Sequence, residues 1–313
     1  MKQLALIGLI LAVSLSFTAC DNGKSNDSSG SDSSSSNTLS EDVSDGVSDL
    51  EPSHSDASSD SGSSDSNPSS QTANTQPADL DTAVLSSLDN AKKGWGQGVN
   101  KDEYNRPTGC LQYQDLYGKY NAYFIEKQEK AIYLTFDEGY ENGYTSQILD
   151  TLKEKECPAV FFVTYDYVDR NPELVQRMID EGHVVGNHSW SHPSMPTISI
   201  DEAKDEIMKL HKYVETNFGY EMTLFRPPMG EFSERTLALT QQLGYKSVFW
   251  SYAYADWDPD NQIGTEQAFE KVTSAEHEGA IYLLHAVSKD NAEILGRVID
   301  DMRANGYTLK ALQ

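Results

Sequence analysis

Residues 131–139 of the 313-residue chain read AIYLTFDEG, a run of apolar and β-favouring side chains that ends in two adjacent carboxylates. Such a run indicates a strand buried on both faces, because a half-exposed strand would alternate apolar and polar residues. Asp137 and Glu138 then stand at the carboxyl end of the strand. Adjacent negative charges repel each other there unless a cation or an arginine neutralises them. On this evidence alone, a solvated turn and a functional site are equally good explanations.

Strand-like and helix-like segments alternate from this run to the end of the chain. Helical patterns occupy residues 145–154, a segment that starts at Pro172 after the cap residue Asn171, and residues 201–216, 233–243, 266–275 and 291–305. Strand-like runs occupy residues 159–164, 184–186, 246–250, 280–284 and 307–309. This alternation predicts parallel strands joined by right-handed helical crossovers. Because about seven strands fall short of the eight-unit barrel of about 250 residues, we expect an α/β fold that forms a distorted, incomplete (β/α) barrel.

The segments before residue 131 have a different character. Residues 1–20 combine Lys2 with a short apolar run, which is typical of a signal peptide and too short to span a bilayer, since a spanning helix needs about 20 apolar residues. Their end, FTAC, resembles the lipobox of bacterial lipoproteins, which implies lipidation of Cys20. Ordinary secretion and an uncleaved anchor are the alternatives, and each of the three places the rest of the protein outside the cytoplasmic membrane.

Composition separates a spacer from the folded part of the chain. Residues 21–80 are rich in Ser and Asp with almost no large apolar residues, so we expect a disordered, extended spacer. We expect residues 81–130 to form a cap or lead-in segment on a domain of residues 131–313. The formal net charge of −25 argues against nucleic-acid binding, which needs a positive surface. Cys110 and Cys157 could form a disulfide in an exported protein, although two separate buried thiols are favoured slightly.

Several polar residues follow the predicted strands. His188 and His192 are four residues apart, the spacing at which two imidazoles on one helical turn can hold a metal ion. Arg226 starts a rigid RPPMG loop and could neutralise a site carboxylate, whereas a surface arginine on a structural turn is the plainer alternative. Asp256, which precedes Trp257, could likewise belong to the site, whereas a surface aspartate beside a half-buried tryptophan is the plainer alternative. His285 ends an apolar strand, so it is either a site residue or a histidine satisfied within the core.

Five segments therefore carry candidate site residues, and they contain, in chain order, Asp137, the His188–His192 pair, Arg226, Asp256 and His285. Together they resemble the polysaccharide deacetylase family, the NodB-homology carbohydrate esterases of family 4, over about residues 131–312. The likeness is greatest to the delta-lactam-biosynthetic and peptidoglycan N-acetylmuramic acid deacetylases, and it rests on residues 137–145, 186–189, 250–252 and 256–257. The resemblance implies that Asp137 is the general base, His285 the general acid, Arg226 the partner of the base, Asp256 the residue that sets the charge of His285, and Glu138, His188 and His192 the metal ligands. A backbone N–H near Met229 would hold the oxyanion.

The resemblance also implies a cofactor, which is one divalent metal ion, with zinc first and cobalt or manganese as alternatives. One position departs from the family pattern. Most members have Asp where this chain has Glu138, and the longer side chain must fold back to reach the same ion. Whether Glu138 binds the metal therefore stays open.

The resemblance further implies a metal-dependent hydrolase that releases acetate from N-acetylated sugars. The candidate sugar-binding residues are Trp190, Met229, Tyr252 and Trp257, with Tyr254 also in a site loop. An exported, anchored deacetylase points to peptidoglycan glycan strands as partner, with N-acetylmuramic acid as the first choice of target. Peptidoglycan N-acetylglucosamine and chitin oligomers are alternatives, and a non-catalytic wall-binding lipoprotein is the alternative of another class. We expect a monomer that faces the cell wall.

Overall fold

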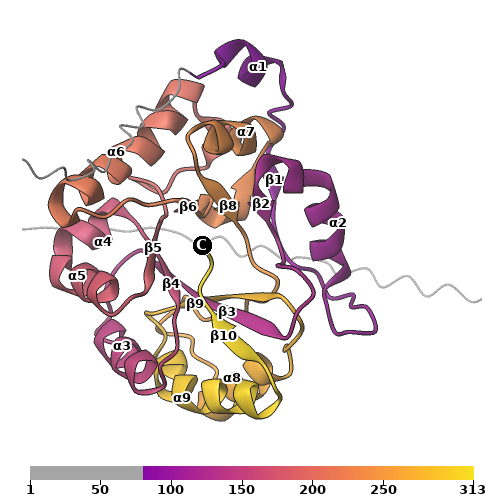
Figure 1. Cartoon of the computed structure of the whole chain (residues 1–313), viewed down its shortest axis with the longest axis vertical. Helices are drawn as coiled ribbons and strands as arrows, with labels where there is room; N and C mark the ends of the chain where they lie inside the picture. Colours follow the sequence, from indigo (N-terminus) through magenta and orange to yellow (C-terminus); the bar gives the residue numbers. More distant parts are fainter. Residues whose placement is uncertain (1–79) are drawn as a thin grey trace, which may run out of the picture. The chain divides into compact units, whose positions relative to one another are not determined.

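Strand β3 (Ala131–Glu138) pairs with three other strands of the sheet and is buried along its whole length, as its apolar sequence predicts. The computed structural model describes residues 80–313. The predicted signal peptide, the lipidation of Cys20 and all but the last residue of the predicted spacer lie outside the described residues. Figure 1 shows the strands in the interior of the molecule with helices around them.

Eight strands of the described residues form one parallel sheet that curls into an incomplete barrel. Their order is β10 (Thr308–Lys310), β3, β4 (Val160–Val163), β5 (Val184–Asn187), β6 (Leu224–Phe225), β8 (Lys246–Val248) and β2 (Ala122–Tyr123), and β9 (Ala280–His285) also pairs with β3. Every pair in this sheet is parallel. The predicted distorted (β/α) barrel is thus confirmed. The register of this sheet brings two candidate site residues together, because Asp137 of β3 pairs with His285 of β9.

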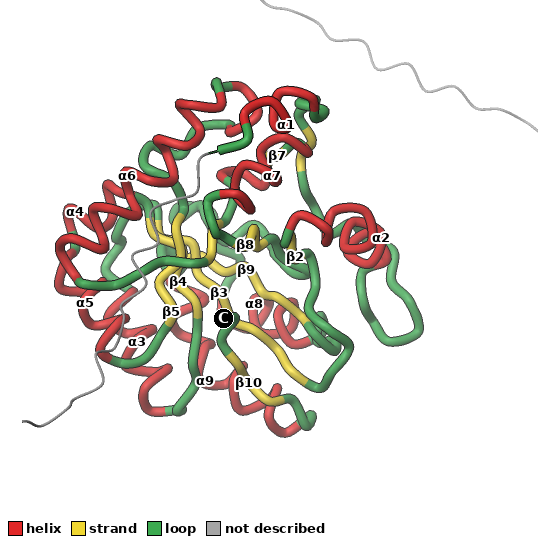
Figure 2. Tube along the Cα trace, turned by 45° about the horizontal axis from the view of Figure 1, so that its top comes forward, coloured by secondary structure: helices red, strands yellow, loops and turns green. Residues whose placement is uncertain are grey.

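Helices cover the outside of this sheet (Figure 2). They are α3 (Thr145–Glu154), α4 (Tyr165–Arg170), α5 (Pro172–Asp180), α6 (Ile200–Phe218), α7 (Glu234–Gln242), α8 (Thr265–Thr273) and α9 (Lys289–Ala304). Each buries an apolar face in the core. The sequence pattern missed α4, and Asn171 does not cap α5 with its side chain. Its amide instead donates to the Tyr167 carbonyl at 3.0 Å, which satisfies the end of α4.

Residues 80–130 pack against the barrel. They contain α1 (Thr82–Ser87), β1 (Lys93–Gly94), α2 (Thr108–Tyr117), the 3₁₀ turn η1 (Gly118–Tyr120) and β2. β2 joins the sheet edge beside β8, and β1 pairs with β7 (Glu231–Phe232). The Trp95 indole donates to the Trp250 carbonyl at 2.9 Å and packs edge-on against Phe124. This segment therefore holds the chain after β8, where part of the site is built.

Two smaller observations complete the fold. Cys110 and Cys157 are both buried and free, as the slightly favoured alternative predicts. Within residues 80–313, no helix has the length and apolar character that crossing a membrane requires.

Candidate functional site

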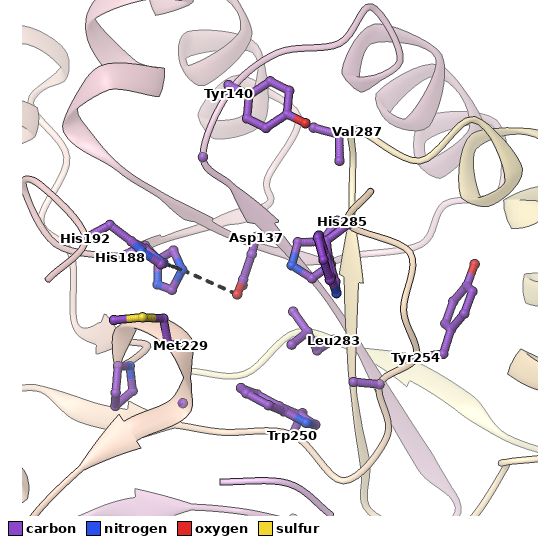
Figure 3. A pocket seen from close by; sticks show the side chains of 15 residues that line it. Asp137, Tyr140, His188, His192, Met229, Trp250, Tyr254, Leu283, His285 and Val287 are labelled. Atoms are coloured by element: carbon purple, nitrogen blue, oxygen red, sulfur yellow. Dashed lines mark hydrogen bonds and ion pairs between the residues drawn. The ribbon is translucent and has the colours of Figure 1, made fainter. Parts of the chain in front are cut away.

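A cavity of about 570 Å³ opens at the carboxyl ends of the central strands. Seven of the residues predicted for the site line it: Asp137, His188, His192, Met229, Tyr254, Trp257 and His285. Figure 3 shows Asp137 between the two neighbouring histidines on one side and His285 on the other. Residues separated by almost 150 positions in the sequence thus meet in one cavity.

Asp137 is a buried carboxylate held by a buried arginine. Arg226 follows β6, is fully buried, and donates from Nη1 to Asp137 Oδ1 at 2.6 Å. Its remaining nitrogens donate to the carbonyls of Val248 at 3.1 Å and Phe249 at 3.2 Å, so the guanidinium cannot turn away. Burial alone would raise the pKa of Asp137, but the charge of Arg226, with smaller contributions from His188 and His285, holds it below its usual value. Asp137 is therefore ionised at neutral pH.

The two histidines converge by a tight turn after β5 and not by the predicted helical turn. Ser189 and His192 adopt left-handed conformations, with φ of 72° and 59°. The Asn187 side chain accepts from the Ser189 N–H at 2.8 Å, and the Ser189 hydroxyl accepts from the His192 N–H at 2.9 Å. These side-chain hydrogen bonds replace the backbone ladder of a helix. The spacing of four residues therefore predicted correctly that the His188 and His192 rings lie close together. It predicted wrongly that the chain between them forms a helical turn.

The ring nitrogens are arranged as metal ligands would be. His188 Nδ1 lies 2.9 Å from the Arg226 carbonyl and must donate to it, so His188 Nε2 carries a lone pair. This atom faces His192 Nε2 at 3.2 Å and Asp137 Oδ2 at 3.5 Å. Burial lowers the pKa of His188 to about 4 and also lowers that of His192, so both rings are neutral at pH 7. Two neutral nitrogens this close suit a shared divalent cation, because bonds of about 2.0–2.1 Å in a tetrahedral arrangement would separate them by a similar distance.

Glu138 is not among the residues that line the cavity with the two histidines, although the family resemblance implied all three as metal ligands. Successive side chains of a strand point to opposite faces, and Asp137 occupies the face toward the cavity. Glu138 is fully buried outside the cavity lining, and neither of its carboxylate oxygens has a hydrogen-bond partner among residues 80–313. Burial, and then the charges of Glu141 and Asp137, raise its pKa well above the usual value. In the described part of the chain, no three His, Cys, Asp or Glu side chains are grouped to hold a metal.

His285 is paired with a buried carboxylate on the other side of the cavity. Its Nδ1 lies 2.8 Å from Asp256 Oδ1, and its backbone N–H donates to Asp256 Oδ2 at 2.9 Å. Asn291 also donates to Asp256 Oδ2, at 2.6 Å. Burial alone would lower the pKa of His285, but the hydrogen bond and charge of Asp256 outweigh burial and raise it. The ring can therefore carry a proton toward the cavity.

The cavity walls are largely apolar, and the sequence identified them only in part. Trp190 lies outside the lining and stacks on Tyr165 with 3.6 Å between ring centroids, while Tyr252 is buried against Tyr282. Tyr254 is in the lining as a site-loop residue. The lining also includes residues that sequence reasoning did not select: Tyr140, Trp250, Leu283 and Val287. Leu283 could have been found, since it precedes His285 by two positions and thus shares its face of β9.

Met229 and Gly230 form a close-fitting corner of the cavity. Met229 has a left-handed backbone, with φ of 58°, and its backbone N–H donates to no acceptor within residues 80–313. Gly230 also has a positive φ, of 65°, and a Cβ there would stand 2.7 Å from the Trp250 ring. The backbone can approach the indole only because this residue is glycine.

Comparison with known proteins gives the following matches. A family model described as polysaccharide deacetylase matches residues 125–248. The peptidoglycan-N-acetylmuramic acid deacetylase PdaA of Bacillus subtilis is 43% identical over 234 residues, which make up 74% of this chain and 88% of PdaA. The solved structure of PdaA, a family 4 carbohydrate esterase, matches with a TM-score of 0.68 and covers 72% of this chain and 96% of that chain.

Two further relatives differ from PdaA in what their names say. The peptidoglycan-N-acetylglucosamine deacetylase PgdA of Listeria monocytogenes is 37% identical over 182 residues, which cover 58% of this chain and 38% of PgdA. A structure of a wild-type CE4 family pseudoenzyme from Bacillus anthracis is 26% identical with a TM-score of 0.56, and the match covers 60% of this chain and 66% of that chain. The fold is thus shared by proteins described as enzymes and by one described as a pseudoenzyme.

Proposed function

Because the chain belongs to the polysaccharide deacetylase family, we propose that it hydrolyses the acetamide of N-acetylmuramic acid in peptidoglycan and releases acetate. One observation carries this proposal. An ionised carboxylate and a histidine with a raised pKa face the same cavity from neighbouring strands, with a histidine pair beside the carboxylate. Amide hydrolysis needs such a base and acid together. The 43% identity to PdaA supports muramic acid as the target.

Asp137 is the general base in this proposal. Arg226 holds its Oδ1, so Oδ2 is the oxygen that can take a proton from the attacking water. The water oxygen then bonds to the acetamide carbon while its proton passes to the carboxylate. A divalent ion on His188 and His192, zinc first with cobalt or manganese as alternatives, would polarise the acetamide carbonyl when bound. Glu138 has no part in holding it in this arrangement.

The remaining groups complete the hydrolysis. The free N–H of Met229 donates to the oxyanion that develops on the carbonyl oxygen. His285, held by Asp256 through Nδ1, gives its other ring proton to the sugar nitrogen as the C–N bond breaks. The bonding electron pair stays on that nitrogen, so the products are the free amine of the sugar and acetate. Without this proton an amide nitrogen is too poor a leaving group to depart.

A second function has a specific observation behind it. A wall-binding protein without catalysis would need the cavity but not a complete metal site, and Glu138 lies outside the cavity lining that contains the two histidines. The family contains a protein described as a pseudoenzyme. Asp137, Arg226 and His285 stand in hydrogen-bonded positions, which favours the enzyme.

The proposal includes the place of the protein in the cell. Residues 1–20 would direct export, lipidated Cys20 would anchor the chain, and residues 21–80 would let a monomeric catalytic domain of residues 131–313, with its lead-in segment, reach the wall. An extracytoplasmic position agrees with a glycan substrate that lies outside the membrane.

The test is mass spectrometry of glycan fragments after incubation of peptidoglycan with the full chain, with added zinc and with a chelator. Loss of one acetyl group from the muramoyl residue is the expected result, and Asp137→Asn should abolish it. Asp180→Asn, at an exposed position of α5, removes the same charge as a control. Loss of acetyl from glucosamine alone would change the target, and glycan binding without acetate release would favour the wall-binding protein.

A further inference from the structure

A second groove, of about 310 Å³, adjoins the catalytic cavity. Ala253 and Tyr254 line both hollows, so this short segment is their common wall. The wall is fixed by Gln97, whose amide nitrogen donates to the Ala253 carbonyl at 3.0 Å and whose amide oxygen accepts from the Trp250 indole at 3.1 Å. A polymer with one sugar in the catalytic cavity would therefore meet this groove with a neighbouring part.

The groove carries positive charge in an acidic protein. Lys101, from the loop before α2, and Lys271, from α8, line it. Within the described part of the chain no Asp or Glu lines it, although the chain has a net charge of −25. His277 is the other titratable side chain of basic type in the lining, and burial lowers its pKa to about 4, so it is neutral. The positive charge of the groove therefore comes from the two lysines.

Neither lysine is neutralised by a carboxylate of the described residues. Lys101 donates to the amide oxygen of Asn105 at 2.8 Å, and Lys271 is absent from the ion pairs formed within residues 80–313. The neighbouring Asp102 is paired with Arg106 at 2.7 Å. Glu270 lines a third hollow together with Lys271, but the two form no ion pair within residues 80–313. Elsewhere on the surface lysines do pair, for example Lys155 with Asp300 at 2.6 Å.

The groove also presents surface that a sugar ring can contact. Val99 is 90% exposed and lies in its lining, so it presents an apolar side chain to the groove. Tyr252 and Tyr254 border the groove as well, together with polar side chains such as Asn105 and Ser274. Apolar and hydrogen-bonding surface beside two ammonium groups suits a glycan with an acidic substituent better than a neutral polymer.

We propose that the Lys101–Lys271 groove is a second glycan subsite that binds a carboxylate on the branch of a muramic-type sugar. The inference rests on the proposed function and deepens it, since it makes an anionic glycan the preferred substrate class. The carboxylate is either that of the free lactyl group or one on an attached stem peptide. Ammonium groups on flexible stems act as point charges, so the attraction should not depend on one binding geometry and should weaken with salt.

The test uses the full chain with Lys101→Gln/Lys271→Gln. The control is Lys119→Gln/Lys127→Gln, which makes the same charge change at exposed positions outside both hollows. Both are assayed on glycan strands with stem peptides, on amidase-stripped strands with free lactyl groups, and on neutral N-acetylglucosamine oligomers. For at least one acidic glycan we expect KM to rise about tenfold at low salt with kcat unchanged, since two exposed ion pairs are lost. The control and the neutral oligomer should not change, and high salt should remove the difference.

The outcomes separate the subsite from the catalytic proposal. An effect on stripped strands alone would identify the lactyl carboxylate, and an effect on stem-bearing strands alone would identify the peptide. Unchanged KM on both acidic glycans, or an equal rise on the neutral oligomer, would overturn the subsite while leaving deacetylation intact. Binding of labelled strands by fluorescence anisotropy is measured in parallel. This binding measurement tests the groove even if no acetate is released. The absence of acetate release would itself refute the proposed function.

Discussion

Removing the arginine behind the base should destabilise the protein in a pH-dependent way. Arg226→Met deletes the hydrogen bonds to Asp137 and to the carbonyls of Val248 and Phe249, while a side chain of similar length keeps the space filled. Arg226 is fully buried and Asp137 is 8% exposed, so water cannot replace the lost guanidinium. Breaking a buried ion pair by removing one partner costs about 3–5 kcal/mol. That is a large part of the 5–15 kcal/mol that typically stabilises a domain.

The sign of the pH dependence follows from the lowered pKa of Asp137. A carboxyl group whose folded pKa is depressed stabilises the fold above its unfolded pKa, and this contribution is lost as the pH falls through its folded value. Without Arg226, burial is the largest remaining influence and raises the pKa of Asp137. The Arg226→Met protein should then recover part of its relative stability as the pH falls from 7 toward 4, because Asp137 can become neutral.

Urea denaturation with a chelator present measures these free energies of unfolding. Arg226→Met, Asp137→Asn and the double variant form a double-mutant cycle. We expect the double variant to lose less than the sum of the two single losses, by about 2 kcal/mol, because it leaves no unpaired buried charge. Losses at pH 7 that add to within about 0.5 kcal/mol, or a loss from Arg226→Met that does not change with pH, would refute the reasoning.

Three further predictions concern single positions. Asp256→Asn should lower the pKa of His285, because it removes the carboxylate that raises it, and the alkaline limb of the kcat profile should move to lower pH; an unmoved limb would show that another group limits the rate. Gly230→Ala should lower the free energy of unfolding by about 1–3 kcal/mol in calorimetry, because its Cβ would press on the Trp250 ring at a positive φ, and a stability equal to the parent's would contradict this contact. Glu138→Gln should leave the zinc dissociation constant unchanged in isothermal titration calorimetry, and tenfold weaker binding would place that carboxylate at the ion.

Several features of the protein follow from its sequence because they depend on neighbouring residues. The apolar run of residues 131–136 predicts a strand buried on both faces, and β3 is such a strand. The apolar spacing in residues 145–154 predicts the buried face of α3. Strand and helix patterns of this kind are local, so their alternation was enough to predict a parallel barrel and to place Asp137 and His285 at the ends of strands.

Tertiary structure decided which side chains share a cavity. Whether Glu138 faces the histidines depends on the side of β3 that the cavity occupies, and the run of apolar residues on both faces does not reveal it. Trp190 stacks on Tyr165 and does not line the cavity, because packing against a residue distant in sequence sets the direction of its side chain. Lys101 and Lys271 border one groove although 170 positions separate them. Side-chain direction and long-range packing arise only when the whole chain closes, because each is set by contacts with residues distant in sequence.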